Sequence, residues 1–513
     1  MTFTTEATED RHFVQTEYTE NFTNQELRDL GSFFGASTSV FSVVILCDTM
    51  SPMNVLLIST YELGRQPFGL ASPAAWLREA GHSVASADLS REPLDPAAVR
   101  RAALVAFYLP MHTATRLALP IIERVRTLNP SAHLCAYGLY APLNAGVLRA
   151  RGVASILGGE FEDDLVRVAA RASAQVMSET REPKRSLPRL KFLVPYRDDL
   201  PALSTYSSVV LPDGARRVVG YTEASRGCKH LCRHCPVVPI YNGQFRIVSP
   251  DVVLADIRAQ VAHGARHVTF GDPDFFNGIG HALRIVEALA RECPGVTYDV
   301  TIKIEHLLRH AVHLPRLRET GCLFVTSAVE SIDNRVLQIL EKGHTRDDFV
   351  RVSNLCREAG LTLSPTFVAF TPWTTLEGYR ELLKMIDELG LAEHVAPIQL
   401  TIRLLFPERS RLLELGLVQD LIGPFDPENL VYRWVHPDPR LDALQRDVAR
   451  LVGAHVNSAR SATFREVWML VHRGEVTTSM PSFAELVDGV STVPYLDEPW
   501  YCCAEPLGAE SLL

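Results

Sequence analysis

The stretch RVVGYTEASRGCKHLCRHCPVV, residues 217–238, joins a predicted strand directly to three closely spaced cysteines. Residues 217–225 are predicted to form the strand. Cys228, Cys232 and Cys235 follow it within eight residues, and no fourth cysteine stands nearby. Three thiolates are an incomplete ligand set for a metal that takes four ligands. The pattern therefore predicts a metal centre at a strand end, with one coordination position left open.

Two kinds of metal centre are consistent with this loop. A structural zinc site would need His230 or His234 as its fourth ligand. Such sites usually draw two ligand pairs from two distant segments, and the C-x2-C half here has no mate. Thiolates also select iron–sulfur chemistry, and three cysteines would hold three irons of a [4Fe–4S] cluster. The spacing favours the cluster, whose fourth iron would accept a substrate-like ligand.

The surrounding pattern predicts an α/β protein with two parallel sheets. Residues 216–406 contain six strand–helix units, which predicts a (β/α)6 partial TIM barrel rather than the eight units of a closed one. Residues 53–171 alternate short apolar runs with amphipathic helices, as in a doubly wound, Rossmann-like parallel sheet. Ligands of such sheets lie at the carboxyl ends of the strands. The candidate binding residues there are Gly64, Gly138, Gly158, Gly159 and Glu160.

Three further segments complete the predicted organisation. Residues 1–52 are acidic and are expected to be a disordered extension or the product of a misassigned start. Their apolar run, VFSVVIL, is too short to span a bilayer. Residues 172–215 contain five prolines and are predicted to be a linker. Residues 407–513 are predicted to form a mainly helical C-terminal region ending in WYCCAEP.

Length, charge and cysteine content limit the functional classes. A chain of 513 residues is too long for one ordinary core, so two or three domains are expected. The net charge is −9 and there is no long Lys/Arg run, which argues against a nucleic-acid partner. No membrane partner is expected either, since the one apolar run of residues 1–52 is too short to span a bilayer. Ten cysteines without a disulfide-framework spacing indicate a reducing, cytoplasmic location.

The C-x3-C-x2-C spacing, placed after the first barrel strand, resembles the signature of the radical S-adenosylmethionine (SAM) superfamily. The resemblance implies that Cys228, Cys232 and Cys235 hold a [4Fe–4S] cluster and that SAM chelates its open iron. An electron from the cluster, supplied by a donor of the flavodoxin or ferredoxin type, then breaks a carbon–sulfur bond. His234 stands where the family usually has an aromatic residue, and its flat ring can pack against adenine.

Two other motifs resemble SAM-binding stretches of this family. FGDPDFFNG, residues 270–278, follows the second strand and nominates Gly271, Asp272 and Asp274 for the SAM ammonium group. The stretch after the fourth strand nominates Glu330 and Ser331 for the ribose or methionine part. Helix capping is the alternative role for the residues of both motifs.

Residues 53–171 resemble the cobalamin-binding domain that precedes the barrel in one large class of radical SAM enzymes. The corrinoid methionine synthases carry D-x-H-x-x-G, whose histidine ligates cobalt. Here STYELG places Ser59 and Tyr61 at the Asp and His positions. The resemblance thus implies cobalamin without a protein ligand on its lower face. A degenerate domain that only shields the barrel mouth is the alternative.

The ending WYCCAEP, residues 500–506, resembles that of the CUAEP/CCAEP-tail radical SAM proteins, in which selenocysteine can replace one cysteine. Adjacent cysteines are poorly placed for an ordinary disulfide. Cys502 and Cys503 are therefore predicted to be reactive, holding a soft electrophile such as a trivalent arsenical, relaying an electron or quenching a radical. Two small residues buried in a docked C-terminus are the alternative.

Together these features predict a radical SAM enzyme, most simply a transferase, that modifies a small molecule. Cobalamin-dependent methyl transfer is the leading expectation. A first alternative is cobalamin-independent transfer of an aminocarboxypropyl radical to an acceptor held by the tail cysteines. A second alternative is a non-catalytic zinc- or corrinoid-binding protein.

Overall fold

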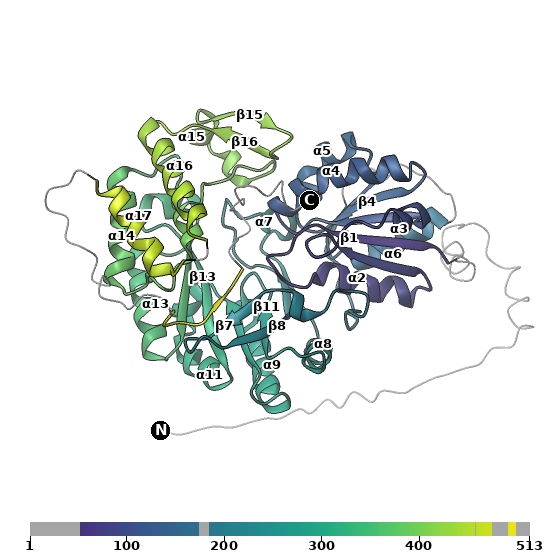
Figure 1. Cartoon of the computed structure of the whole chain (residues 1–513), viewed down its shortest axis with the longest axis horizontal. Helices are drawn as coiled ribbons and strands as arrows, with labels where there is room; N and C mark the ends of the chain where they lie inside the picture. The colour runs from purple at the N-terminus through teal and green to yellow at the C-terminus, as the bar shows by residue number, and fades with distance from the viewer. Residues whose placement is uncertain (1–51, 174–183, 457, 474–490, 499–513) are drawn as a thin grey trace, which may run out of the picture. The chain divides into compact units, whose positions relative to one another are not determined.

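The computed structural model describes residues 52–173, 184–456, 458–473 and 491–498 (Figure 1). They contain two main sheets, each with helices packed against it. Within the described residues, no helix is long and apolar enough to cross a membrane. Residues 1–51 and the tail from residue 499 onward, which includes Cys502 and Cys503, lie outside the described residues.

The N-terminal sheet has six parallel strands in the order β2-β1-β3-β4-β5-β6. Its strands are β1 (Asn54–Ser59), β2 (Ser83–Asp88), β3 (Leu104–Tyr108), β4 (His133–Tyr137), β5 (Ser155–Gly159) and β6 (Lys184–Ser186). The strand order reverses between β1 and β3, and ligands of doubly wound sheets bind at such a switch point. The prediction of a doubly wound parallel sheet is therefore confirmed.

Alternating apolar side chains on these strands build one core on each face of the sheet. Leu56 and Ile58 point to one core, whereas Val55 and Leu57 point to the other. The first core is closed by α3 (Pro96–Arg101), α4 (His112–Leu128) and α5 (Ala145–Ala150). The second is closed by α2 (Phe68–Glu79) and α6 (Glu162–Ser173). Burial on both faces explains why these strands have nearly continuous apolar runs.

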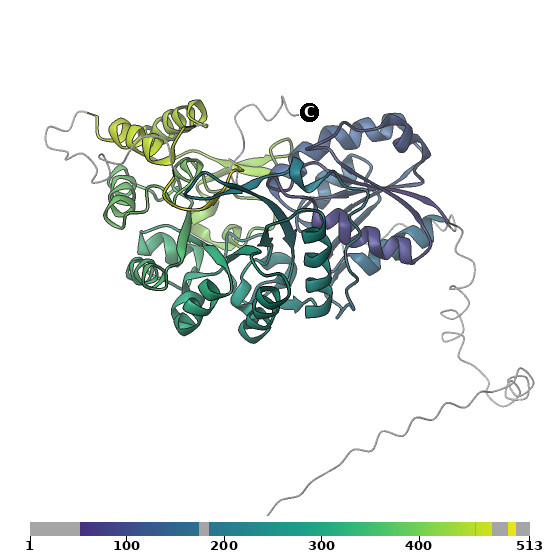
Figure 2. The same ribbon diagram turned by 60° about the horizontal axis from the view of Figure 1, so that its bottom comes forward.

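The barrel sheet has five parallel strands with its helices on the outer face (Figure 2). The strands are β8 (Arg216–Thr222), β11 (His267–Phe270), β12 (Thr297–Thr301), β13 (Cys322–Glu330) and β14 (Thr362–Phe367). The helices are α8 (Pro250–Ala262), α9 (Ile279–Glu292), α10 (Ile304–Arg309), α11 (Leu314–Glu319), α12 (Asn334–Leu340), α13 (Arg346–Glu358) and α14 (Leu376–Glu388). This arrangement confirms a partial barrel.

The sixth strand of the predicted barrel is reduced to a single parallel bridge between Phe370 and Arg403. The backbone N–H of Phe370 donates to the carbonyl of Ile402 over 2.9 Å, and that of Leu404 donates to Phe370 over 2.8 Å. Just before Ile402 and Arg403, the residues Pro397–Leu400 form a 3-10 helix instead of extended backbone. A proline that cannot donate to a strand ladder starts that helix, which shortens the strand.

The predicted linker adds a strand to each sheet. Strand β6 extends the N-terminal sheet, and β7 (Ser208–Val210) pairs antiparallel with β8. Strand β17 (Tyr495–Leu496), from the C-terminal region, pairs antiparallel with β7. The rest of that region contains the hairpin β15 (Ile422–Asp426) and β16 (Val431–Trp434), followed by α16 (Pro439–Ala454) and α17 (Arg460–Val471). Both of these helices bury apolar residues in the barrel core.

Candidate functional site

The three cysteines lie on one loop between two short elements. This cysteine loop, residues 228–237, starts after β9 (Ser225–Gly227), which pairs antiparallel with β10 (Phe245–Ile247), and leads into α7 (Val238–Tyr241). Gly227 has a φ of +77°, and a Cβ there would lie 2.5 Å from the Gln244 carbonyl oxygen. Only glycine suits this position, so the turn into the first cysteine is set by local backbone geometry.

The three thiols lie in a partly buried environment. Cys232 is buried, Cys228 and Cys235 are half-buried, and all three are free of disulfide bonds. Burial, together with the neighbouring thiols, raises the pKa of Cys228 to about 11 and that of Cys235 to about 12. Such thiols keep their protons unless a cation stabilises the thiolate. The loop is therefore suited to a metal centre rather than to a free nucleophile.

The donor set fits a cluster better than a single zinc ion. Among the described residues, the three sulfur atoms do not form a group in which all lie within 4.8 Å of one another. Zinc bonds of about 2.3 Å to sulfur hold thiolates no more than about 4.6 Å apart. His230 Nε2 lies instead beside Asp274, and His234 Nε2 lies 3.1 Å from Glu330. Neither histidine therefore completes a zinc site with the cysteines.

A buried ion pair borders the cysteine loop. Lys342, only 3% exposed, places its Nζ 3.4 Å from Glu330 Oε1. Burial alone would raise the pKa of Glu330, but the charge of Lys342 and the hydrogen bond with His234 lower it to about 2. The same ammonium also interacts electrostatically with Cys232 and Cys235. Lys342 is not among the residues predicted from the sequence, although its position one residue before Gly343 in EKGHT is a signal for a turn.

Ser331, the neighbour of Glu330, has a local role. Its Oγ accepts a hydrogen bond of 3.1 Å from the backbone of Asp333, and Asp333 in turn caps α12. Glu330 itself adopts a left-handed φ of +67°, which turns its carboxylate toward His234 and Lys342. The structure thus places Glu330 beside the cysteine loop and uses Ser331 in the turn that precedes the helix. Contact of either residue with SAM stays a prediction.

Both candidate carboxylates after β11 bond within the protein. Asp272 accepts hydrogen bonds from the Ala224 backbone and from the Ser225 hydroxyl, and burial raises its pKa to about 7. Asp274 caps a 3-10 helix through the backbone N–H of Phe276, 3.2 Å away. A Cβ at Gly271 would lie 2.0 Å from the Tyr221 hydroxyl, so packing explains this glycine. These contacts do not test whether Gly271, Asp272 and Asp274 bind the SAM ammonium group, which stays a prediction.

The glycines at the carboxyl edge of the N-terminal sheet allow close packing of the chain. A Cβ at Gly158 would lie 2.2 Å from Pro142, and one at Gly138 would lie 2.9 Å from the Leu109 carbonyl. A Cβ at Gly64 would lie 2.0 Å from side-chain oxygens of both Glu498 and Ser207. Gly159 has a positive φ of +77°. These contacts explain why glycine is needed, whether or not a ligand approaches the same edge.

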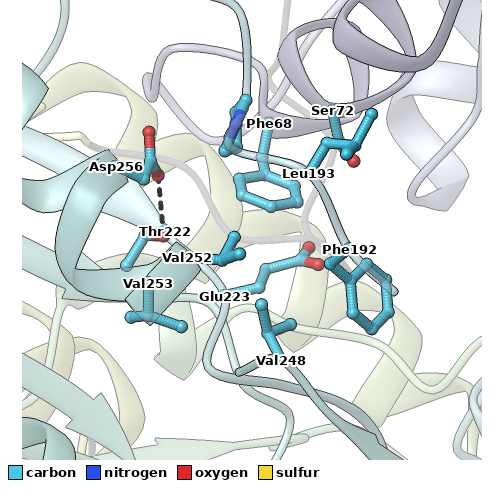
Figure 3. Close-up of a pocket in the computed structure, with 11 residues that line it drawn as sticks. Phe68, Ser72, Phe192, Leu193, Thr222, Glu223, Val248, Val252, Val253 and Asp256 are labelled. Atoms are coloured by element: carbon cyan, nitrogen blue, oxygen red, sulfur yellow. Dashed lines mark hydrogen bonds between the residues drawn. The ribbon is translucent and has the colours of Figure 1, made fainter. Parts of the chain in front are cut away.

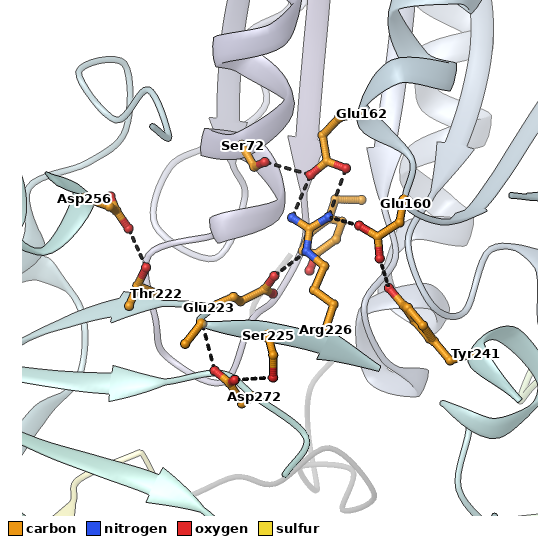
Figure 4. A network of polar contacts seen from close by, with 12 residues as sticks. Ser72, Glu160, Glu162, Thr222, Glu223, Ser225, Arg226, Tyr241, Asp256 and Asp272 are labelled. Atoms are coloured by element: carbon orange, nitrogen blue, oxygen red, sulfur yellow. Dashed lines mark hydrogen bonds and ion pairs between the residues drawn. The ribbon is translucent and has the colours of Figure 1, made fainter. Parts of the chain in front are cut away.

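Arg226 joins the N-terminal sheet to the cysteine loop. Its guanidinium is 2.6 Å from Glu223, 2.7 Å from Glu162 and 3.3 Å from Glu160 (Figure 4). We call these four residues the Arg226 cluster. Burial raises the pKa of Glu160 to about 7, against the opposing charge of Arg226. The sequence pattern nominated Glu160 as a cofactor ligand, whereas in the structure its carboxylate bonds Arg226 and the hydroxyl of Tyr241.

A small pocket lies beside this cluster (Figure 3). It is lined mainly by apolar side chains, among them Phe68, Phe192 and Val252, with the Glu223 carboxylate pointing into it. At its rim Thr222 donates to Asp256 over 2.8 Å. No lining residue belongs to the cysteine loop or to the ion pair beside it. We therefore assign this pocket no part in the chemistry.

Several buried polar atoms at the carboxyl edge of the N-terminal sheet have no hydrogen-bond partner within the described chain. Among them are Ser59 Oγ at the end of β1, Thr113 Oγ1 after β3 and Asn144 Oδ1 after β4. These strands flank the switch point of the sheet. Buried polar groups are normally paired, so a bound ligand with polar groups would suit this edge. Tyr61 donates to Glu498 over 2.9 Å, so its hydroxyl is already engaged.

The cysteine loop packs directly on the apolar core that ends at this edge. Cys228 and Cys235 contact the core that contains Tyr140 and Leu143, and α7 adds Tyr241 to it. A ligand at the switch point of the sheet and a cluster on the loop would therefore belong to neighbouring sites. The residues present fit a cobalamin-type ligand that has no protein ligand on its lower face.

Comparisons with known proteins agree with this geometry. The family model of the radical SAM superfamily matches residues 222–388. A bacteriochlorophyllide d C-8(2)-methyltransferase of Chlorobaculum tepidum is 24% identical over 218 residues, which are 40% of this chain and 47% of that protein. The chain thus spans about half the length of the curated relatives it matches.

Two solved structures share the fold over most of the chain. The radical SAM methyltransferase TsrM of Kitasatospora setae superposes with a TM-score of 0.61 at 17% identity, covering 84% of this chain and 97% of that chain. The cobalamin-dependent SAM radical enzyme OxsB gives a TM-score of 0.62 at 13% identity, covering 79% and 68%. Residues 222–388 therefore match the radical SAM superfamily, and the fold over most of the chain is like that of OxsB and TsrM.

Proposed function

We propose that this protein cleaves SAM reductively at a [4Fe–4S] cluster and transfers a methyl group to a small molecule with the help of cobalamin. The observation that carries the proposal is the packing of the cysteine loop against the carboxyl edge of the N-terminal sheet. Methyl transfer between two cofactors requires that they be neighbours. Methyl transfer by the bacteriochlorophyllide d methyltransferase relative and by TsrM supports the same reaction class.

The chain's own residues have distinct parts in this proposal. Cys228, Cys232 and Cys235 would hold the cluster, which when bound supplies the electron that cleaves SAM. Lys342 places a positive charge beside these thiolates and Glu330 fixes the position of that charge. Ser59, Thr113 and Asn144 would bond the polar groups of cobalamin, which carries the methyl group. The Arg226 cluster links the N-terminal sheet to the segment that precedes the cysteine loop.

Product analysis tests the reaction. The full-length protein is reconstituted anaerobically with iron, sulfide and hydroxocobalamin, and is then given SAM and a strong reductant. We expect 5′-deoxyadenosine together with S-adenosylhomocysteine, identified by mass spectrometry. Methylthioadenosine that requires the cluster would instead favour aminocarboxypropyl transfer and direct attention to Cys502 and Cys503. A colourless protein that keeps zinc and cleaves no SAM would contradict both enzymatic proposals.

Cysteine variants test the cluster assignment separately from turnover. Replacing any one of Cys228, Cys232 or Cys235 with alanine should reduce bound iron from about four atoms per chain to a small fraction. The brown colour should fade with it, because each thiolate holds one iron. Cys356, a buried cysteine of α13, is the matched control, and Cys356→Ala should keep the iron. Equal iron loss in the control would show that the effect is not specific to the loop.

A further inference from the structure

A second group of ligand-type side chains meets beside the cysteine loop. His230 lies between Cys228 and Cys232, Asp274 follows β11, and His306 is on α10. His306 Nδ1 lies 2.7 Å from Asp274 Oδ2, and His230 Nε2 lies 3.4 Å from the same oxygen. Within the described chain, this is the one group of three or more such residues whose ligand atoms all lie within 4.8 Å of one another.

The three atoms are close together but are not aligned for hydrogen bonds. His230 Nε2, Asp274 Oδ2 and His306 Nδ1 are buried, and none has a hydrogen-bond partner of acceptable geometry among the described residues. An imidazole N–H donates in the ring plane, so a short contact outside that direction is not a hydrogen bond. In a metal site, by contrast, the lone pairs point to the ion rather than to one another.

Burial makes an uncompensated group of this kind costly. Asp274 is 1% exposed and His306 is 3% exposed. Buried polar atoms are nearly always paired, and a buried carboxylate needs a counter-charge. Lys303 places its Nζ 3.6 Å from Glu305 Oε2 and is thus paired with that carboxylate. A divalent cation among the three ligand atoms would satisfy all of them at once.

We propose that His230 Nε2, Asp274 Oδ2 and His306 Nδ1 bind one divalent transition-metal ion, with zinc the best match, separate from the cluster on the cysteines. Two imidazole nitrogens and one carboxylate oxygen are typical zinc ligands and leave a fourth position open. Tetrahedral bonds of about 2.0–2.1 Å place neighbouring ligand atoms about 3.3 Å apart. The observed separations of 2.7 and 3.4 Å lie on either side of that value.

An outer partner supports the ligand geometry. Glu305 Oε2 lies 3.5 Å from His230 Nδ1, the ring nitrogen that points away from the three ligand atoms. A carboxylate on the far nitrogen of a metal-bound histidine fixes its tautomer and makes it a better ligand. The ion would tie the cysteine loop to the loop after β11 and to α10, which start from three different strands. It would thus hold the loop in place independently of SAM cleavage.

Metal analysis of the cluster-loaded, full-length protein tests the site. The protein is incubated with Zn²⁺, dialysed, and analysed for zinc and iron by mass spectrometry. About four irons per chain show that the cysteines are occupied, so that zinc cannot be held there. We expect about one additional zinc per chain in the wild type. His306→Gln should weaken zinc binding by at least about 100-fold, because removing a direct ligand exceeds the effect of an outer partner.

Two further variants decide the interpretation. His310→Gln changes an imidazole on the next turn, whose ring centre is 5.7 Å from that of His306, and should keep the zinc. Glu305→Gln removes only the outer partner and should weaken zinc binding by about 10- to 100-fold, which covers the case in which His306→Gln does not fold. The proposal is overturned if the wild type keeps no zinc beyond dialysis. Equal zinc loss in His310→Gln, or none in His306→Gln and Glu305→Gln, would also overturn it.

Discussion

Lys342 brings a buried positive charge to the cysteine loop, and Glu330 keeps that charge in place. Burial alone would lower the pKa of a lysine, but Glu330 and the thiols Cys232 and Cys235 raise the pKa of Lys342 above its ordinary value. The ammonium is therefore charged at neutral pH. At the scale of single residues, the loop is thus prepared for a negatively charged group such as a thiolate-bound cluster.

Removing Lys342 should destabilise the protein strongly, since it leaves the Glu330 carboxylate buried without its cation. We expect Lys342→Met to lower the free energy of unfolding by about 3–5 kcal/mol, measured by urea denaturation. The double variant Lys342→Met/Glu330→Gln should recover much of this loss because no unpaired charge remains. Lys384→Met, which affects only an exposed ion pair with Glu388, should change the free energy of unfolding by less than about 0.5 kcal/mol. A loss in the control as large as in Lys342→Met would contradict the interpretation.

At the scale of elements, β9 and the loop that follows it are fixed by the Arg226 cluster. Three carboxylates from two segments, Glu160 and Glu162 after β5 and Glu223 after β8, converge on one guanidinium, which also lies over the rings of Phe161 and Phe192. Arginine suits this place because its five donors can bond several carboxylates at once. The cluster leaves more negative than positive charge in a buried region, which makes the protonation of Glu160 favourable.

Arg226 variants test whether this contact fixes the loop. Arg226→Gln leaves three carboxylates without a cation and should cost about 3–5 kcal/mol of unfolding free energy. Arg226→Lys keeps the positive charge but loses the planar set of five donors. Its free energy of unfolding should therefore lie between those of wild type and Arg226→Gln. Urea denaturation of the three proteins, with iron content as a second measurement, checks this order. Arg226→Gln with wild-type stability would show that the cluster does not hold the two parts together.

Glu160 should make stability fall as pH rises. Its pKa in the folded protein is about 7, above the ordinary value of 4.5, so the folded state holds the proton more tightly than the unfolded state. The stability that the protonated Glu160 contributes is fully present below pH 4.5 and is lost as pH rises through 7. Glu160→Gln should reduce the slope of unfolding free energy against pH by up to about 1.4 kcal/mol per pH unit. Glu79→Gln, at an exposed site, should leave the slope unchanged.

At the scale of the whole molecule, the described C-terminal segment 491–498 returns to the beginning of the N-terminal sheet. Strand β17 pairs with β7, and Asp497 accepts from the Ser208 backbone over 2.7 Å. Glu498 then accepts from Tyr61, a residue 437 positions earlier in the sequence. This contact joins the loop after β1 to the segment that precedes the two tail cysteines.

The bond between Tyr61 and Glu498 should be measurable in global stability. Tyr61→Phe removes the phenol hydroxyl from the half-buried Glu498 carboxylate, so the free energy of unfolding should fall by about 1–2 kcal/mol. Thermal and urea denaturation would both detect a change of this size. Tyr432→Phe, at a ring that meets Phe425 edge to face, is the matched control and should stay within about 0.5 kcal/mol of wild type. Identical stability of Tyr61→Phe and wild type would show that the segment is held by β17 alone.

The parts of this protein that depend on local pattern could be predicted from sequence. Alternating apolar runs and helices give the doubly wound sheet, and the partial barrel follows from the same alternation. The three cysteines are close in the chain, so their spacing alone was enough to single out the loop that we propose to hold the cluster. The sixth strand was overestimated, because an apolar run does not reveal whether its backbone stays extended next to Pro397.

The partners of the polar residues were decided only by tertiary structure. Glu160 and Arg226 are 66 positions apart, and His234 and Glu330 are 96 apart. Asp274 finds its histidines on the cysteine loop and on α10. Periodicity and spacing act over a few residues, whereas these contacts form when distant strand ends meet at one edge. The sequence by itself therefore determined the two sheets and the cysteine loop, and only the folded chain decided which charges and ligands surround that loop.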